Sequence, residues 1–483
     1  MGKSIMRKVF DGLFYVAIGK YTGFILSLVI AGILSRILNP SDFGVMSLAT
    51  ICITFFTLFC DLGIGTAIIQ NKTLDENNYR ELFTFSFIIG IAISCCVILF
   101  SYLYGSFYES EKLTTLCHIM ALSLFFNALN TIPNGLLYKE KMFRFLAIRN
   151  VTIQLAGGGL AILCAYRGLG VYALTIQPIF TAIASFITCY VHQPIRPSLH
   201  FTKETFSKIF SYSGFQFLFN IINFFSRNID NLLVGKYLGV KPLGFYDKSY
   251  RLVMLPLENT SNLLSSVVHP VFADFQDRKD EQIHYYEKIV FLLAFIGFPM
   301  SAFFYFTSYD LILFIFGDQW IESVPLFRIL SLSIGFQMIL SSSGSIFQAT
   351  NETRLLFISG LISTICNVIA MIVGIFIFKS LIILAWALVI SFTINFIQCY
   401  VLLYIYNFKR KIYYFIRQLR MPLELGITLS VMLFAISKIV YSKVHFINLT
   451  VYTIATIIVV LIYVAVRKPF DLNKIKQLIS KHS

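Results

Sequence analysis

Two stretches, Arg36-Ile-Leu-Asn-Pro-Ser-Asp-Phe-Gly44 and Lys236-Tyr-Leu-Gly-Val-Lys-Pro-Leu-Gly244, each follow a long segment that is predicted to be helical. They lie 200 residues apart, and Arg36 matches Lys236, Leu38 matches Leu238 and Gly44 matches Gly244. Three matches in nine positions are weak evidence alone. Their places after the first and seventh predicted helices, however, are those expected for two six-helix bundles related by a parallel repeat.

The composition of the whole chain indicates a membrane protein. Of its 483 residues, 57% are hydrophobic and 13% are charged, whereas soluble domains have about 45–50% apolar and about 25% charged residues. A membrane-spanning helix needs about 20 residues. The chain therefore has room for many spans and little else, which excludes a soluble enzyme, a nucleic-acid-binding domain and a receptor with a large folded exterior.

Apolar runs bounded by proline, glycine and charge clusters predict an all-α integral membrane fold with about fourteen transmembrane helices. The predicted helices cover residues 12–35, 44–69, 82–104, 115–137, 147–165, 171–191, 209–235, 247–271, 287–307, 327–348, 355–377, 381–405, 422–441 and 446–466.

These helices group into predicted domains. The chain would consist of a six-helix lobe over 1–191, a cytoplasmic linker over 192–208, a second six-helix lobe over 209–406, a basic cytoplasmic loop over 407–421, helices 13 and 14 over 422–466 and a basic cytoplasmic tail over 467–483.

The positions of the basic residues predict the orientation. With a cytoplasmic N-terminus, 25 of the 39 lysine and arginine residues lie in or beside cytoplasmic segments and eight lie in or beside outside loops. An excess of lysine and arginine in short loops marks the cytoplasmic side. We therefore predict a multi-pass protein with both termini in the cytoplasm, and we assign most of the net charge of +15 to these loops.

Polar side chains recur every three or four residues along six of the predicted helices, so that each set lies on one helix face. The predicted lining residues are Asn127, Asn134, Gln216, Asn220, Asn223, Asn231, Asn262, Gln337 and Asn395. Because surfaces that face lipid are apolar, such stripes face protein or water. A single polar residue could simply join two helices by a hydrogen bond, but stripes on six helices favour a central hydrophilic cavity.

Charged residues within the predicted helices indicate what this cavity binds. The basic ones include Lys20, Arg227, Lys248 and Arg251, and the acidic ones are Asp61, Asp230 and Glu258. Ion pairs between Arg227 and Asp230 and between Arg251 and Glu258 would still leave Lys20 and Lys248. Surplus positive charge favours an anionic substrate, because guanidinium groups bind phosphate oxygens through two parallel hydrogen bonds.

The sequence has no recognisable catalytic, nucleotide-binding or metal-binding motif. Gly239 and Gly244 have the spacing of a phosphate-binding loop, but Phe245 stands where that loop requires lysine. Every predicted outside loop is short, so an enzyme acting on soluble sugar chains has little room. We predict a secondary transporter that is not an enzyme, has no cofactor and has no catalytic or metal site.

Several motifs together resemble a known family. They are Leu38-x-Pro40-x-Asp42-Phe43-Gly44, Asp61-Leu-Gly-Ile-Gly65, Arg227-Asn-x-Asp230, and Gly235-Lys-Tyr-Leu-Gly239 followed by Leu243-Gly-Phe-Tyr246. Their order and spacing resemble the polysaccharide-transport branch of the multidrug/oligosaccharidyl-lipid/polysaccharide (MOP) superfamily, and within it the WzxC-like group of Wzx lipopolysaccharide O-unit flippases. The resemblance covers the whole chain and is strongest over 10–75 and 210–260.

The resemblance implies a MATE-like architecture of two six-helix lobes that work by alternating access. The implied substrate is an oligosaccharide repeat unit linked to undecaprenyl pyrophosphate. It would be moved across the bacterial inner membrane for lipopolysaccharide or other polysaccharide export. Polysaccharide polymerase and glycosyltransferases are further implied partners besides membrane lipid, and nucleic acid is not one.

The surplus of basic residues on the polar helices suggests which residues contact such a substrate. Lys20, Arg227, Lys248 and Arg251 would contact pyrophosphate or an acidic sugar. If a proton or sodium gradient drives transport, the candidate coupling residues are Asp61, Asp230 and Glu258, each of which could instead be a structural ion-pair partner.

Two alternatives remain at this stage. A MATE-like exporter of small cations shares the fold plan, and it requires a functional carboxylate where we place basic groups. A membrane enzyme or scaffold of polysaccharide assembly would not transport at all, and an enzyme of this kind would form its product in detergent without two separated compartments.

Overall fold

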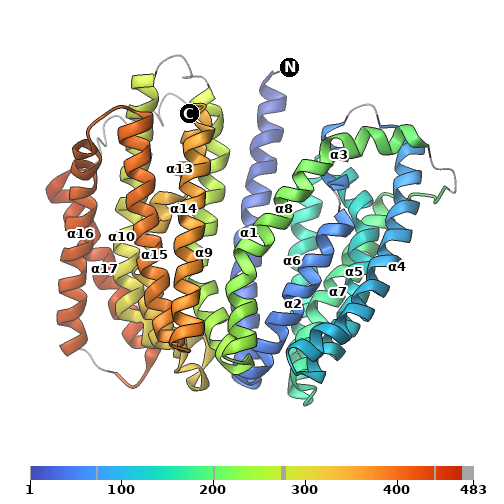
Figure 1. Ribbon diagram of the computed structural model, residues 1–483, viewed down its shortest axis with the longest axis horizontal. Coiled ribbons are helices and arrows are strands. Elements are labelled where there is room, and N and C mark those ends of the chain that lie inside the picture. Colours follow the sequence, from blue (N-terminus) through green and yellow to red (C-terminus); the bar gives the residue numbers. More distant parts are fainter. Residues whose placement is uncertain are drawn as a thin grey trace. The chain divides into compact units, whose positions relative to one another are not determined.

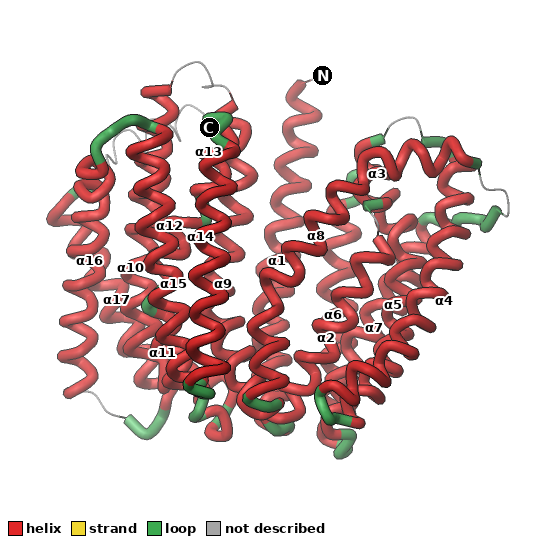
Figure 2. Tube along the Cα trace, in the orientation of Figure 1, coloured by secondary structure: helices red, strands yellow, loops and turns green. Residues whose placement is uncertain are grey.

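The computed structural model describes residues 2–61, 63–71, 74–198, 202–273, 279–439 and 442–469, with side chains described outside 2–14, 203–216, 219, 259–273 and 279. All regular secondary structure in these residues is helical (Figure 2). The chain divides into two compact units, Met1–Gly244 and Phe245–Ser483. Unit 1 includes α8 and the first five residues of α9, and the division into the predicted lobes stays a prediction.

Unit 1 is built around a central helix (Figure 1). Its elements are α1 (Gly2–Ile37), α2 (Pro40–Asp61), α3 (Ile64–Gln70), α4 (Glu76–Phe107), α5 (Glu111–Lys139), α6 (Phe143–Tyr166), the short helix Gly170–Tyr172, α7 (Ala173–His192), α8 (Lys203–Tyr237) and the start of α9 (Val240–Ala273). Helix α5 packs against α2, α3, α4 and α7, while α1 packs on α6 and α8 on α2. This arrangement buries an apolar core that includes Ile68, Leu82 and Ile132.

Polar residues at helix ends explain where several helices of unit 1 begin. Asp75 and Asn78 form a reciprocal capping box at the start of α4, with Oδ1 of Asp75 accepting from the Asn78 backbone N–H at 2.8 Å. Ser110 caps α5 by accepting from the backbone N–H of Leu113. Each cap satisfies an N–H that has no partner within its helix.

The ends of four helices follow the 200-residue offset seen in the sequence. Helix α1 ends at Ile37 and α2 begins at Pro40, while α8 ends at Tyr237 and α9 begins at Val240. The starts of α2 and α9 cross in direct contact within unit 1. A Cβ atom added to Gly44 would lie 1.8 Å from the backbone oxygen of Val240, and one added to Gly244 would lie 2.1 Å from that of Pro40. Only glycine permits so close a backbone approach.

Unit 2 has α10 at its centre (Figure 1). Besides the rest of α9, its elements are α10 (Lys279–Phe316), the short helix Asp318–Trp320, α11 (Ser323–Ser331), α12 (Ile334–Leu340), α13 (Ser343–Ala349), α14 (Thr353–Met371) with a π-helical turn Ile372–Ile377, α15 (Leu381–Val401) with a π-helical turn Leu402–Asn407, α16 (Ile412–Ile439) and α17 (His445–Arg467).

Helix α10 packs against α11, α12, α16 and α17. A buried aromatic cluster fixes one end of this packing, where the rings of Tyr400 and Phe415 stack with centroids 4.1 Å apart. The hydroxyl groups of Tyr286 and Tyr400 hydrogen bond at 3.0 Å, so these two buried polar groups have partners.

The predicted all-helical membrane fold is confirmed, and every predicted helix range is helical over most of its length. Range 44–69 is broken into α2 and α3, and range 327–348 into α11, α12 and α13. In the described residues, eleven helices are long and apolar enough to span a membrane, or twelve if the bent pair Ser323–Ser331 and Ile334–Ala349 counts as one span. Helices α8 and α9 are not among them, so the number fourteen stays a prediction.

Candidate functional site

The start of α9 carries a compact charged group in unit 2. Asp247 and Arg251 are four residues apart, so they lie on one helix face, and Nε of Arg251 donates to the Asp247 carboxylate at 3.0 Å. The Asp247 side chain is 10% exposed and that of Arg251 is 62% exposed. No described residue is bonded to the two Nη groups of Arg251, which therefore remain available for a ligand.

Lys248 lies beside this pair but faces a different environment. It is buried, and its ammonium group sits 5.1 Å from the ring centroid of Phe316 and 5.8 Å from that of Trp320. Cation–π contacts of this kind hold a positive charge in an aromatic setting. Lys248 and Arg251 were both predicted from the sequence and lie on one helix. The Arg251 side chain is exposed, whereas that of Lys248 is buried against aromatic rings.

The ion pairs considered from the sequence are not the ones that form. Arg251 pairs with Asp247 and not with Glu258, which is exposed. Asp247 was missed because the predicted helix began at that residue, although the i, i+4 spacing was visible. Arg227 makes no ion pair with Asp230, and Oδ1 of Asp230 accepts from the backbone N–H of Asn231.

The remaining predicted basic residues lie in unit 1 on separate helices. Lys20 on α1 and Arg227 on α8 are both exposed, and neither has a salt bridge within the described part of the chain. Within α8, Asn231 is buried, with an Oδ1 atom that has no hydrogen-bond partner in the described part of the chain, and Asn220 and Asn223 are half-buried. The side chains of Gln216 and Asn262, also predicted to line the cavity, lie outside the described residues.

Several predicted lining residues join helices or bond within one. In unit 2, Nε2 of Gln398 donates to the Asn395 side chain at 2.7 Å and to Ser359 on α14 at 2.9 Å. Gln337 donates to Ser333 within its own segment. These contacts match the hydrogen-bonding alternative considered for single residues.

Asp61 has a structural role at the break between α2 and α3. Its Oδ1 atom accepts from the backbone N–H of Gly65 at 3.1 Å, and Gly63 between the helices has a φ angle of 76°. The carboxylate thereby satisfies a free N–H in the first turn of α3. Its exposed side chain also leaves it open as a coupling candidate.

Arg149 on α6 is a buried cation that was not among the predicted site residues. It is 9% exposed, and it donates to Asn134 at 3.1 Å, to Asn150 at 2.8 Å and to the Cys189 sulfur. No carboxylate is bonded to it within the described residues. Neutral acceptors from α5, α6 and α7 therefore stabilise its charge, and their loss is costly.

This arrangement predicts different effects for two asparagines of α5. Replacing Asn134 by alanine should lower the free energy of unfolding by about 2 kcal/mol, because a buried guanidinium loses an acceptor. Asn127→Ala is the matched control, since Asn127 makes no side-chain hydrogen bond with the described residues. Its cost should stay within about 0.5 kcal/mol. Denaturant unfolding in detergent measures both, and equal losses would refute the difference.

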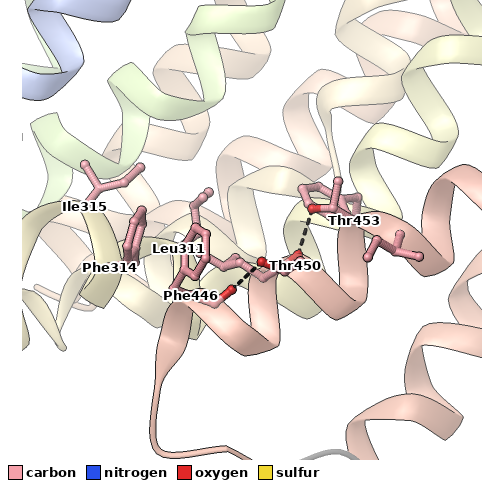
Figure 3. Close-up of a pocket in the computed structure, with 9 residues that line it drawn as sticks. Leu311, Phe314, Ile315, Phe446, Thr450 and Thr453 are labelled. Atoms are coloured by element: carbon pink, nitrogen blue, oxygen red, sulfur yellow. Dashed lines mark hydrogen bonds between the residues drawn. The ribbon is translucent and has the colours of Figure 1, made fainter.

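An apolar groove lies between α10 and α17 in unit 2, with a volume of about 370 Å³ (Figure 3). Its lining residues are Phe303, Leu311, Phe314, Ile315, Phe446, Leu449, Thr450, Thr453 and Ile454. The hydroxyl groups of Thr450 and Thr453 donate to backbone oxygens of their own helix at 2.8 and 2.7 Å. Because these hydroxyl groups are already bonded, the groove is suited to a hydrocarbon chain.

Comparison with known proteins gives consistent results. A family described as polysaccharide biosynthesis protein matches residues 33–325. The lipopolysaccharide biosynthesis protein WzxC of Escherichia coli is 24% identical over 379 residues, which covers 77% of this chain and 76% of WzxC.

Solved structures share the fold. The lipid II flippase MurJ, in an inward closed conformation, has a TM-score of 0.73 at 16% identity, covering 93% of this chain and 98% of MurJ. An inward-facing MATE transporter of the MOP superfamily has a TM-score of 0.58 at 15% identity, covering 78% of this chain and 92% of the transporter. The MATE-like architecture and the resemblance predicted from the sequence are confirmed. The chain is thus a multi-pass membrane protein that belongs to the polysaccharide biosynthesis protein family and has the fold shared by MurJ and the MATE transporters.

Proposed function

We propose that this protein is a flippase for undecaprenyl-pyrophosphate-linked oligosaccharide repeat units, working by alternating access in the bacterial inner membrane. Membership of a polysaccharide biosynthesis family carries this proposal. The fold supports it, because MurJ, which shares the fold, is itself a flippase of a lipid substrate.

The described residues offer suitable chemistry for each part of such a substrate. The free Nη groups of Arg251 form a planar fork that matches phosphate oxygens. Arg227 presents a second exposed guanidinium in unit 1, and Lys248 adds positive potential behind the first. The groove between α10 and α17 accommodates hydrocarbon, and the half-buried amides of Asn127 and Asn223 can bind sugar hydroxyl groups.

Exposed arginines within helices of a membrane protein also argue against a site for cations. A small-cation exporter needs a carboxylate that is open to its substrate. In the charged group of α9, the acid Asp247 is buried and engaged in an ion pair, so this group does not suit a cation, and an exporter would have to use the exposed carboxylate of Asp61 or Glu258. We therefore place the exporter second, although a MATE transporter shares the fold.

The direct test is transbilayer movement in proteoliposomes. Fluorescent or radiolabelled undecaprenyl-pyrophosphate oligosaccharide is reconstituted on both leaflets, and an external glycosidase reports the fraction that becomes accessible. We expect the protein to expose the inner-leaflet fraction, and imposed proton and sodium gradients to show which ion, if either, drives it.

Three other outcomes would contradict the proposal. No movement under any gradient, with folded protein present, would shift the assignment to the small-cation exporter. New product formed from the same oligosaccharide in detergent would indicate an enzyme of polysaccharide assembly. Exposure in protein-free liposomes equal to that with protein would remove the evidence for a flippase.

A further inference from the structure

A polar cavity lies in unit 2, where α10, α16 and α17 approach one another. It has a volume of about 350 Å³, within the range of small-molecule sites. Its lining residues are Tyr309, Asp310, Ser437, Ser442, Lys443, His445, Asn448 and Tyr452. None of them belongs to the charged group of α9 or to the apolar groove.

The carboxylate of Asp310 is fixed within this cavity by neighbours on α17. Its Oδ1 atom accepts from Nδ1 of His445 at 2.8 Å and from Nδ2 of Asn448 at 2.9 Å. The Asn448 amide is itself held by the backbone of Ser442, through bonds of 2.9 and 3.0 Å. The His445 ring packs edge-on against Tyr309. A carboxylate held in this way is pre-organised for binding.

Several polar groups of the cavity have no partner among the described residues. Oδ2 of Asp310 accepts no hydrogen bond there, although the side chain is only 10% exposed. Three donor groups of the cavity likewise have no hydrogen-bond partner among these residues: the hydroxyl groups of Tyr309 and Tyr452 and the ammonium group of Lys443. The cavity thus offers one strong acceptor, three donors and two aromatic rings.

This combination suits a sugar ring better than other small ligands. A sugar has apolar C–H faces that pack on aromatic rings and a rim of hydroxyl groups that both donate and accept. A phosphate would be repelled by the Asp310 carboxylate. A metal ion would lack ligands, because the described residues contain no group of three His, Cys, Asp or Glu side chains that could hold one.

We infer that this cavity is a saccharide-binding site, with Asp310, Tyr309 and Tyr452 as its principal contacts. In the predicted orientation, the end of α10 and the start of α17 lie at the periplasmic face. The site would there hold a sugar of the exported glycan, and this assignment of the ligand's source rests on the proposed function. The binding of a sugar as such does not.

Binding can be measured on the purified full-length protein by saturation-transfer NMR, with methyl glycosides of glucose, galactose, N-acetylglucosamine and glucuronic acid as probes. The detergent must lack a sugar headgroup, since maltoside would compete. We expect saturable binding of at least one glycoside. Asp310→Asn keeps the shape of the side chain but replaces the free acceptor with a donor, and Tyr452→Phe removes only a hydroxyl group. Each should weaken binding at least tenfold.

Tyr463→Phe is the matched control, because Tyr463 is on the same helix and its hydroxyl donates to the Met421 backbone away from the cavity. Its affinity should equal that of the unaltered protein. The inference would be overturned if none of the four probes bound saturably. It would also be overturned if Asp310→Asn and Tyr452→Phe both bound glycoside with the affinity of the unaltered protein. Glycoside binding without lipid transport would contradict only the proposed flippase function. Lipid transport without glycoside binding would contradict only the saccharide-binding site.

Discussion

Replacing Gly44 by alanine is expected to lower the free energy of unfolding by about 3 kcal/mol, at the upper end of the cost of an added methyl group in a packed core. The new Cβ atom would lie 1.8 Å from the backbone oxygen of Val240. Backbone atoms cannot rotate away as a side chain can, so the starts of α2 and α9 would have to separate. Denaturant unfolding in detergent would measure the loss.

The reciprocal contact at Gly244 gives a second test of the same helix crossing. Gly244→Ala brings a Cβ within 2.1 Å of the Pro40 backbone oxygen, so it should cost about as much. Because either change alone must open the same crossing, the double variant should cost less than the sum of the two.

The control for both variants is a helical glycine with open space around it. A Cβ at Gly159 on α6 meets no atom within 4 Å, and alanine has the higher helix propensity, so Gly159→Ala should be neutral or slightly stabilising. A loss below about 0.5 kcal/mol for Gly44→Ala, or a loss at Gly159 equal to it, would show that the crossing is not tightly packed.

The helices could be predicted from the sequence because apolar length and bounding charges determine them locally. The prediction was least complete where helices continue past the apolar run. Helix α10 begins at Lys279, before the predicted 287, because polar residues such as Asp280 and Glu281 also suit a helix start. The break after Asp61 was missed, although Gly63 and Gly65 were visible, since a left-handed glycine shows itself only in the backbone.

Pairing between side chains was harder to predict than the presence of polar stripes. Asn134 and Asn127 lie on the same helix and look equivalent in the sequence, yet only Asn134 bonds to a buried arginine. The partner, Arg149, comes from another helix, so the packing of α5 against α6 and α7 decides its role. The cavity at Asp310 likewise depends on residues more than 130 positions apart.

Neutralising Arg251 or Arg227 is expected to reduce flipping by about 10- to 100-fold, the effect of losing one hydrogen-bonded charge contact with phosphate. The proteoliposome assay measures this for Arg251→Ala and Arg227→Ala separately. Both side chains are exposed, so the variants should remain folded by size-exclusion chromatography. Arg251→Lys should recover only part of the activity, because lysine keeps the charge but lacks the planar fork.

An ion pair with the same spacing elsewhere in the chain provides the control. Nε of Arg420 donates to Glu424 at 3.0 Å with the same i, i+4 spacing as Arg251 and Asp247, but on α16. The Arg420–Glu424 pair is more exposed and contributes about 0.3–0.5 kcal/mol to stability. Arg251→Ala removes the arginine partner of the buried Asp247 carboxylate and should cost more, about 1–3 kcal/mol, so the folded fraction of each variant is measured beside its flipping. If Arg420→Ala leaves flipping unchanged and Arg251→Ala reduces it about 10- to 100-fold while remaining folded, the loss reflects the substrate and not a broken i, i+4 ion pair. Flipping at the unaltered rate by both Arg251→Ala and Arg227→Ala would mean that the anionic group of the substrate is held elsewhere, and the basic residues of α8 and α9 would then lose their assigned role.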